Sequence, residues 1–429
     1  MKKSVAVIGS GIAGMGAAYY LRKEFDVHLY ERNNYIGGHT NTVNLRRDGK
    51  NLPIDSGFMV FNDKTYPNLI RLFDELGVDS YDTSMSFGVQ NVETGLEFAC
   101  SGFSSFFAQR LNLAKLPHWK LYKEIIQYFE SADTALERPS DPSWTLEEFV
   151  GEFGLSPGVV EDFIAPMASA IWSTPNTKIM DFPAQTLLRF LKNHQMLGVG
   201  IQLQWKTVKG GSQTYRDSLL SKLTRPPLSS YGVESVAPSF DGGAQLTFNN
   251  GEQKRFDYAV IATHADQALA LLSDPSELQA KVLCHFHYNT NPVVLHSDSS
   301  VMPRSKRAWA SWNFRHSGSS TGNPRSSTHY WMNNLQNVDH ADDYFVSVDY
   351  EGSINPAKVH WSATYEHPRY DAAAISAQAK LPKLNQEGSI FFCGSYFRYG
   401  FHEDALASAI DAANALKERN GIRHELVSL

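Results

Sequence analysis

Cysteine is scarce in this sequence, whose 429 residues contain only Cys100, Cys284 and Cys393. The three lie far apart along the chain, and none forms a C-x-x-C pair or a zinc-type cluster with nearby histidines. We therefore expect three free thiols, no metal site and a reducing compartment such as the cytoplasm.

An excess of positive charge and any long apolar run are also missing. Lys and Arg number 39 against 45 Asp and Glu, which gives a formal net charge of −6. Without a global basic field, nucleic acid is not expected as a partner. No stretch of 18 consecutive residues is apolar, so no membrane-spanning helix is expected. The length suits two or three globular domains.

The first 31 residues have the pattern of a nucleotide-binding β-α-β unit. A β-branched run at 4–8 is followed by G-x-G-x-x-G at Gly9–Gly14, a helical pattern to Leu21 and a second strand pattern at 27–30. In this context the glycines permit a tight turn, close approach of a pyrophosphate and close packing of helix against strand. The helix N-terminus adds N–H donors and a positive dipole.

Two further features favour FAD over a nicotinamide dinucleotide. Glu31 stands 22 residues after Gly9, where a carboxylate can bind the ribose hydroxyls of either dinucleotide. The first feature is Gly37-Gly38, just beyond Glu31, which can bring backbone N–H groups onto a longer cofactor. Near the end of the chain, a strand and loop precede a helix whose N-terminus at Asp404-Ala405 suits a flavin pyrimidine oxygen. The sequence therefore predicts one non-covalent FAD.

The periodicity predicts a mixed helix and strand organisation. Helical patterns cover 103–129, where Pro117 is expected to separate two helices, and 159–171. Helix starts are predicted at Thr145, which forms a capping box with Glu148, and at Ser156 before Pro157. Strands are expected at 233–236, 244–248, 258–263, 291–296, 307–314, 329–333 and 390–393, and a last helix at 404–419.

These elements predict an α/β fold, with a Rossmann-type FAD-binding domain and a mixed α+β substrate domain. The FAD-binding domain is expected to be discontinuous, with residues 1–85, 206–280 and 386–429. The substrate domain is expected at 86–205 and 281–385.

Several segments carry a family resemblance over nearly the whole chain. The fingerprint, IDSGFMVF (54–61), VKGGSQ (208–213), DYAVIATHAD (257–266) and FCGSYFRYGFHEDALASA (392–409) resemble the flavin-containing amine oxidase and phytoene desaturase superfamily. HYNTNPVVLHSD, SWNF, THYWMNNLQ and GFHED look like a narrower group, flavoproteins found beside or fused to cyclopropane-fatty-acid-synthase-like methyltransferases. That group is similar to a flavoprotein implicated in desaturating methylated acyl chains on the way to furan fatty acids.

The resemblance implies cofactor contacts from five parts of the chain. They are the fingerprint with the strand-end acid, the paired-glycine loop, the IDSGF segment, two central strands and the terminal motif. The expected cofactor-binding residues are Gly9, Gly11, Ile12, Ala13, Gly14, Glu31, Arg32, Gly38, His39, Thr40, Gly57, Phe58, Val233, Ala262, Gly394, Ser395, His402, Glu403, Asp404 and Ala405. The sequence departs from the superfamily at Ala405 and Ala409, where glycine is often found, and at His39, where amine oxidases commonly have arginine.

Candidate substrate-site residues are aromatic. Tyr288, Trp312, Tyr330 and Trp331 alternate with asparagines on short strands, which suits an apolar pocket wall with a few oriented polar groups. Alternation along a strand also places about half of such rings in a core. His402 precedes the terminal helix, where it either moves a proton near neutral pH or orients the loop.

A second G-x-G-x-x-G opening a helix is not found, because Gly198-Val199-Gly200 lacks the third glycine. We therefore expect the organic substrate to reduce the flavin directly. The predicted function is dehydrogenation of an apolar substrate, a methylated or unsaturated fatty acyl chain of a phospholipid, and the resemblance implies a functional link to a fatty-acid methyltransferase. The alternatives are an amine oxidase that releases peroxide, and a redox-neutral flavin-dependent isomerase or partner protein.

Contact with a membrane surface is a further expectation from the sequence. Residues 103–129 suit either a core helix pair or a membrane-surface face whose lysines lie beside apolar rings. A local cluster of positive charge, which suits either phospholipid headgroups or a solvated surface, is formed by Arg304, Lys306, Arg307, Arg315 and Arg325.

Overall fold

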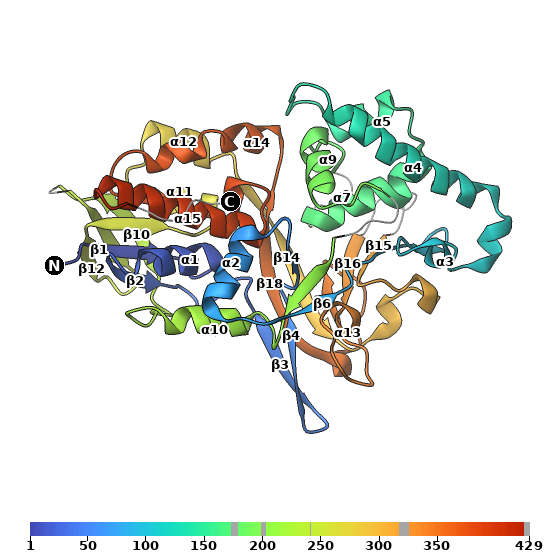
Figure 1. Cartoon of the computed structure of the whole chain (residues 1–429), viewed down its shortest axis with the longest axis horizontal. Helices are drawn as coiled ribbons and strands as arrows, with labels where there is room; N and C mark the ends of the chain where they lie inside the picture. Colours follow the sequence, from blue (N-terminus) through green and yellow to red (C-terminus); the bar gives the residue numbers. More distant parts are fainter. Residues whose placement is uncertain (173–178, 199–202, 241, 317–325, 424–429) are drawn as a thin grey trace.

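The computed structural model describes residues 1–172, 179–198, 203–240, 242–316 and 326–423. Two lobes lie side by side in Figure 1. One contains the N-terminus, α1 (Ile12–Leu21) and α15 (His402–Arg419), and the other contains α4 (Leu116–Leu136) and α9 (Ala184–Asn193). Nothing in this arrangement fixes the predicted domain boundaries, which stay a prediction.

The first lobe is organised around a four-stranded parallel sheet. Its order is β19 (Ile390–Phe392), β13 (Tyr258–Ile261), β1 (Ser4–Ile8) and β2 (Asp26–Tyr30). The strands are buried on both faces, as expected for a parallel sheet covered by helices. The β-α-β start that was read from the sequence and the α/β class are confirmed.

The glycines of α1 let two helices pack closely beside this sheet. A Cβ atom added at Gly16 would lie 2.7 Å from the side chain of Leu406 on α15. The ends of the chain therefore meet in one layer, although almost 400 residues separate them in sequence.

A small antiparallel sheet follows, formed by β10 (Val233–Pro238), β11 (Ala244–Phe248) and β12 (Gln253–Phe256). The sequence reading missed β12 because its residues QKRF are mostly polar and do not alternate clearly. Gly251 lies in the turn between β11 and β12 with φ +80, a backbone conformation that favours glycine.

A seven-stranded sheet lies beside the helices of the second lobe. The predicted strand at 307–314 begins later, at Trp312, because residues 306–308 form a 3-10 turn. The predicted strand at 329–333 ends at Trp331, where a short helix begins. The sheet order is β18 (Val359–Arg369), β14 (His287–His296), β17 (Phe345–Val348), β16 (Ser326–Trp331), β15 (Trp312–His316), β7 (Phe87–Asn91) and β8 (Leu96–Ala99).

The helices of the second lobe agree with several predicted starts. Pro117 lies in the first turn of α4, which follows α3 (Phe103–Phe106) and a 3-10 turn at 110–114. Thr145 forms the expected capping box with Glu148 at the start of α5 (Leu146–Glu152).

The predicted cap at Ser156 is wrong in detail. Its hydroxyl donates to Oε2 of Glu124 on α4, 2.6 Å away, instead of capping the helix. The stretch that follows is α6 (Pro157–Val159), a π-helical turn at 160–164 and α7 (Ala165–Trp172).

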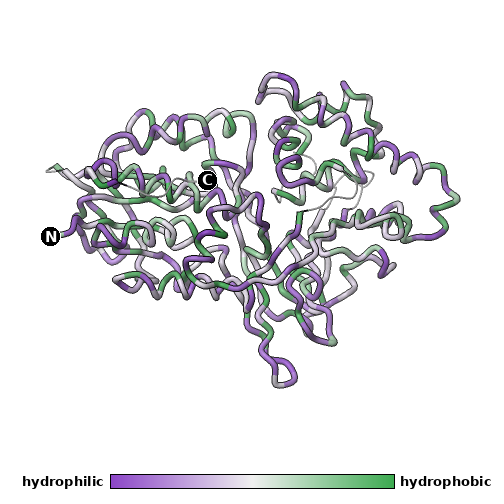
Figure 2. Tube along the Cα trace, in the orientation of Figure 1, coloured by the Kyte–Doolittle hydropathy of each residue, from purple (hydrophilic) through white to green (hydrophobic). Residues whose placement is uncertain are grey.

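The remaining elements connect these sheets. The β3–β4 hairpin projects from the molecule in Figure 1 and is hydrophilic at its tip in Figure 2. The elements are β3 (Thr42–Arg47), β4 (Lys50–Asp55), β5 (Phe61–Asn62), α2 (Pro67–Leu76), β6 (Ser80–Thr83), β9 (Trp205–Val208), α10 (Gln213–Ser221), α11 (Ala265–Leu271), α12 (Glu277–Leu283), α13 (Met332–Leu335) and α14 (Ala372–Gln378).

Across the ranges given above, every helix is too short or too polar to cross a bilayer. The same residues contain no group of three His, Cys, Asp or Glu side chains arranged to hold a metal ion.

Candidate active site

A cavity of about 1340 Å³ opens at the carboxyl ends of the parallel strands. The cavity is lined by residues that directly follow the four strands, namely Gly9 after β1, Glu31 after β2, Ala262 after β13 and Gly394 after β19. Ligands of open α/β sheets bind in this position. All four residues were among those expected to bind the cofactor, and the fold brings them together.

The three fingerprint glycines are required for different reasons. A Cβ atom on Gly14 would lie 1.8 Å from the carbonyl oxygen of Gly9, so this glycine lets α1 start against β1. Gly9 has φ +96 and would place a Cβ atom 2.9 Å from the oxygen of Ala262. At Gly11 an added Cβ atom would meet no described atom within 4 Å. The space beside Gly11 therefore belongs to the cavity.

Glu31 is held rigidly at this edge of the sheet. Its Oε2 atom accepts hydrogen bonds from the backbone N–H and the hydroxyl of Ser10, at 3.0 and 2.7 Å, and its Oε1 atom accepts one from the N–H of Asn33. The carboxylate is only partly buried and still lines the cavity beside Arg32. This geometry suits a hydroxyl-bearing ligand next to the α1 N-terminus.

His402 is partly buried and contacts two fully buried polar side chains. Its Nε2 atom lies 2.7 Å from the hydroxyl of Tyr215 and 3.2 Å from Oγ1 of Thr40, and its ring stacks on Phe58 at 3.9 Å. Burial lowers the pKa of His402 to about 3. The imidazole is therefore neutral near pH 7, which favours a positioning role over proton transfer in that range.

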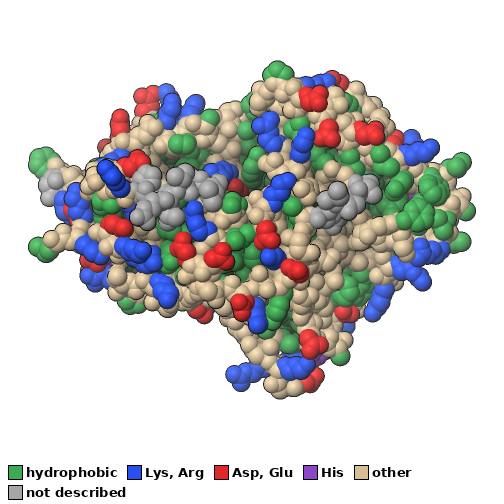
Figure 3. All heavy atoms as spheres, in the orientation of Figure 1, with side chains coloured by type: hydrophobic (Ala, Val, Ile, Leu, Met, Phe, Trp, Pro, Cys, Tyr) green, Lys and Arg blue, Asp and Glu red, His purple; other side chains and the backbone are tan. Residues whose placement is uncertain are grey.

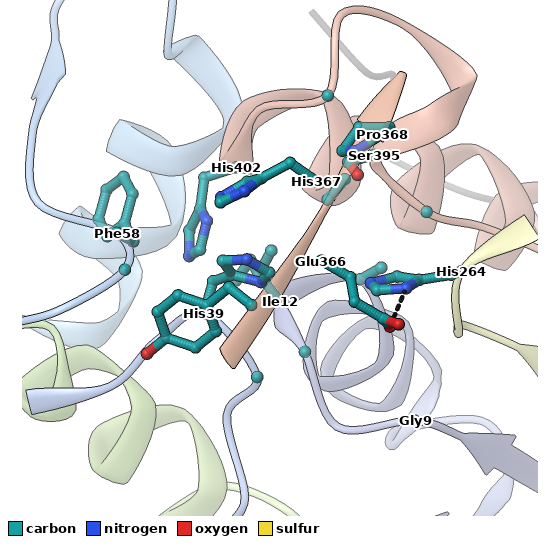
Figure 4. Close-up of a pocket in the computed structure, with 18 of the residues that line it drawn as sticks. Gly9, Ile12, His39, Phe58, His264, Glu366, His367, Pro368, Ser395 and His402 are labelled. Carbon is teal, nitrogen blue, oxygen red and sulfur yellow. Dashed lines mark ion pairs between the residues drawn. The ribbon is translucent and has the colours of Figure 1, made fainter. Parts of the chain in front are cut away.

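His39 presents an unused polar atom to the cavity. Its ring packs beside Tyr365 and His367, with centroids 4.6 and 5.3 Å away, as Figure 4 shows for the two histidines. The Nε2 atom of His39 is shielded from solvent and has no hydrogen-bond partner in the described part of the chain. Burial lowers the pKa of His39, so the ring is neutral. A bound ligand with a polar edge would satisfy this atom.

Another histidine, His264, lies across the cavity from His402 in Figure 4. His264 is paired with Glu366 at 3.3 Å, and this contact lowers the pKa of the Glu366 carboxyl. The ring of His264 stacks on Tyr288 at 4.2 Å. The hydroxyl of Tyr288 accepts the N–H of Ala265 at the start of α11, so this tyrosine both lines the cavity and holds a helix end.

Five predicted site residues do not line the cavity. Gly14 allows α1 to pack against the end of β1, and Thr40 contacts Nε2 of His402. The prediction that Trp331 belongs to the substrate site is wrong. Trp331 does not line the cavity, because its indole donates to Asp343 and its ring packs on Trp309. The other two are Glu403 and Asp404.

Both acids are turned into helix caps. Glu403 accepts the N–H groups of Asn68 and Leu69 at the start of α2, each at 3.0 Å. Asp404 accepts the N–H of Phe401 at the start of its own helix, and burial raises its pKa to about 7. Acidic residues at helix starts commonly cap the free N–H groups of a helix. The contact that Glu403 makes from α15 to the start of α2 has no local signal in the sequence.

The remaining predicted residues line the cavity as expected. They are Gly9, Gly11, Ile12, Ala13, Glu31, Arg32, Gly38, His39, Gly57, Phe58, Val233, Ala262, Gly394, Ser395, His402, Ala405, Tyr288, Trp312 and Tyr330.

The sequence reading missed much of the aromatic wall. Trp172 on α7, Phe190 on α9 and Trp205 on β9 line the cavity with Trp312 and Tyr330, whose rings lie parallel 6.3 Å apart. The helical rings look like ordinary core positions in the sequence. Only the tertiary fold brings them to one side.

These residues fit FAD. The α1 N-terminus with the open space at Gly11, the fixed Glu31 carboxylate and the unpartnered His39 atom offer sites for its phosphate, hydroxyl and ring polar groups. Cys393 is fully buried at the end of β19, does not line the cavity, and burial raises its thiol pKa to about 12. A covalent bond to that sulfur is therefore not supported.

Solved structures with the same fold include two enzymes of different chemistry. A CLA-producing fatty acid isomerase from P. acnes shares 13% identity, with a TM-score of 0.65 over 97% of this chain and 98% of that one. Cyclohexylamine oxidase from Brevibacterium oxydans IH-35A shares 15% identity, with a TM-score of 0.68 over 98% of this chain and all of that one. At such identities the likeness shows the fold alone.

A curated relative matches a short segment. Carotenoid phi-ring synthase from Chlorobaculum tepidum is 35% identical over 79 residues, which are 18% of this chain and 12% of that protein. The family model of flavin-containing amine oxidoreductases matches residues 12–417. The prediction of an FAD-dependent oxidoreductase is confirmed at this level, and the chain belongs to the flavin-containing amine oxidoreductase family.

Proposed function

We propose that this protein is an FAD-dependent dehydrogenase of an apolar substrate, a methylated or unsaturated fatty acyl chain of a phospholipid. The observation that carries the proposal is the composition of the cavity wall. Besides the strand ends and the α1 N-terminus, its lining includes many aromatic rings and methionines, which suit an extended hydrocarbon. These residues are Met59, Met85, Trp172, Phe190, Met196, Trp205, Trp312 and Tyr330.

The acidic side chains of the cavity argue against a cationic substrate. Three line it among the described residues, Glu31, Glu234 and Glu366. Glu31 is engaged at the fingerprint, Glu234 lies on β10 of the nucleotide lobe, and Glu366 is paired with His264. An ammonium group on the aromatic side would have ring faces but no carboxylate to pair with.

The chain's own residues would position the substrate and exclude water. The bound flavin supplies the hydride-accepting ring. Trp312 is 4% exposed, and its Nε1 atom has no hydrogen-bond partner in the described structure, so it can donate to a polar end of the substrate. His39, neutral and with a free Nε2 atom, can hydrogen-bond the cofactor or the substrate. Proximity and dryness would then provide most of the acceleration.

An anaerobic absorbance titration tests the proposal. Purified flavin-loaded protein is mixed with phospholipid that carries methylated or unsaturated chains and, separately, with a panel of amines. We expect lipid to bleach the flavin spectrum and amines to leave it unchanged. Bleaching by amines alone would establish the amine oxidase alternative instead.

A redox-neutral reaction is separated by product analysis. The fatty acid isomerase with this fold makes that chemistry a concrete alternative. Mass spectrometry of the lipid after turnover should show a loss of two hydrogens. An unchanged mass with a shifted double bond would contradict dehydrogenation. The functional link to a fatty-acid methyltransferase stays part of the proposal, since such an enzyme would supply the methylated chain.

A further inference from the structure

The second lobe ends in an exposed apolar projection. Phe103 is 55% exposed, Leu111 81%, Leu113 43% and Leu116 84%. They lie within 14 residues that form α3, the 3-10 turn at 110–114 and the start of α4. Figure 3 shows hydrophobic side chains gathered at this end of the molecule, with lysines and arginines around them. Contiguous exposed apolar side chains mark interaction surfaces.

The leucines are exposed on a rigid support. Beneath them His118 is buried, with Nε2 2.9 Å from the carbonyl oxygen of Phe106, and its ring packs on Phe106 and Phe107. The indole of Trp119 donates to the carbonyl of Leu113 at 2.9 Å. Leu121 and Ile125 on the next turns of α4 are buried. The core interpretation of 103–129 therefore holds for the buried face of α4, and the membrane-surface interpretation remains for the residues before α4 and for the exposed face of its first turns.

Charge around the projection is one-sided. Residues 98–123 contain four Lys or Arg and no Asp or Glu, in a chain whose net charge is −6. All four cationic side chains are exposed, and Lys120 pairs with Glu124, just beyond this stretch, at 3.8 Å. The neighbouring segment 304–308, whose 3-10 turn at 306–308 contacts α3, adds three more exposed cations. The seven are Arg110, Lys115, Lys120, Lys123, Arg304, Lys306 and Arg307.

Two expected members of the basic cluster are not counted among these seven. Arg315 is only half-exposed, and its guanidinium lies over the ring of Tyr350. Arg325 lies outside the described residues. The cluster that the structure forms is centred on the apolar projection, which the sequence alone did not indicate.

We propose that this projection, residues 103–123 with the 304–307 turn, docks on the surface of an anionic phospholipid bilayer. The exposed leucines and Phe103 enter the acyl boundary, and the surrounding cations contact the headgroups. A protein partner would need acidic charge around an apolar groove, whereas an anionic bilayer offers both chemistries at once. The inference extends the proposed function, because a phospholipid substrate is delivered from such a surface.

Vesicle co-sedimentation of the flavin-loaded full chain tests this surface. Vesicles of straight-chain phosphatidylcholine with 30% phosphatidylglycerol contain no methylated chains, so binding is measured without a substrate. We expect binding at low salt that weakens strongly in 0.5 M salt, and little binding to phosphatidylcholine alone. No binding at low salt would overturn the docking proposal and leave the flavin-bleaching test of the substrate unaffected.

Matched variants locate the contact. Leu111→Ser with Leu116→Ser should weaken binding at least tenfold, and Lys115→Glu with Lys123→Glu should do the same at low salt. The control is Leu278→Ser with Val359→Ser, which removes exposed apolar side chains elsewhere and should bind like the parent. Unchanged binding of both projection variants would overturn the proposal. So would a change of oligomeric state in the leucine variant by light scattering, which would indicate a contact between copies of this chain.

Discussion

The nucleotide-binding residues and the aromatic residues of the large cavity would hold a ligand by different physical means. The nucleotide side uses backbone at strand ends and at a helix N-terminus, where glycines set the geometry and a single methyl group decides whether the site forms. The aromatic side uses many rings from separate elements, which share the contact area among them. The first side should therefore fail abruptly on substitution, and the second should weaken gradually.

The sharpest break is expected at Gly14. Gly14→Ala places a Cβ atom 1.8 Å from the carbonyl oxygen of Gly9, so either the strand or the helix must move. We expect a loss of about 3 kcal/mol or more in the free energy of unfolding, with loss of flavin. Urea denaturation of the flavin-free protein measures it.

Gly11→Ala is the matched comparison within the same motif. Its Cβ atom meets no described atom within 4 Å, so stability should change by less than about 0.5 kcal/mol. Affinity for FAD should nevertheless fall about tenfold or more, because the methyl group occupies ligand space. Equal destabilisation by both substitutions would contradict the assignment of that space to the cofactor.

The pH dependence of stability tests the burial of His402 in the folded protein. The folded imidazole has a pKa lowered to about 3, whereas an unfolded histidine titrates near 6.5. The unfolded state alone binds the proton between these values, so stability is lost as pH falls below about 6.5. From pH 7 to pH 5 this amounts to about 2 kcal/mol, and His402→Phe should remove it from the pH profile.

The control for that profile is His285→Phe, at an exposed position. Its denaturation curves at pH 5 and pH 7 should follow those of the parent. A His402→Phe protein whose stability kept the parent's full pH dependence would show that this imidazole is not buried as described.

The smallest effect is expected on the aromatic side. Trp312→Phe keeps a ring and removes the unpartnered indole N–H, so KM should rise a few-fold, by about 1 kcal/mol, while FAD affinity stays unchanged. Trp331→Phe should leave both unchanged, because Trp331 faces Asp343 and Trp309 outside the cavity. Steady-state kinetics with the substrate that bleaches the flavin compares the two. A larger effect at Trp331 would reverse the assignment of the wall.

This contrast also explains how far the sequence predicts the molecule. Backbone-based binding leaves a local signature, so the fingerprint and Glu31 could be found by spacing. Ala262 and Gly394, which follow two other parallel strands, were implied by the family resemblance of their segments. The wall residues Trp172 and Phe190 have no such signature, because a ring that faces a cavity and a ring in a core occupy the same helical positions.

Two predicted site residues lie outside the cavity for a related reason. Glu403 lies beside flavin-facing residues in sequence, but its carboxylate accepts N–H groups from α2, more than 330 residues away. Trp331 follows Tyr330 on one strand, and alternation turns it to the opposite face. In both cases the partner that decides the role lies on an element that local reading does not connect.

The strand order of the parallel sheet has a consequence for folding during synthesis of the chain. β1 pairs with residues near 260, and that strand pairs in turn with residues near 391. During translation β1 and the fingerprint are made well before β13 and β19, so the parallel sheet stays incomplete until β19 follows. The contacts are of very high sequence separation, so the cofactor edge should be among the last parts to acquire native order, and the nascent chain should depend on chaperones until then.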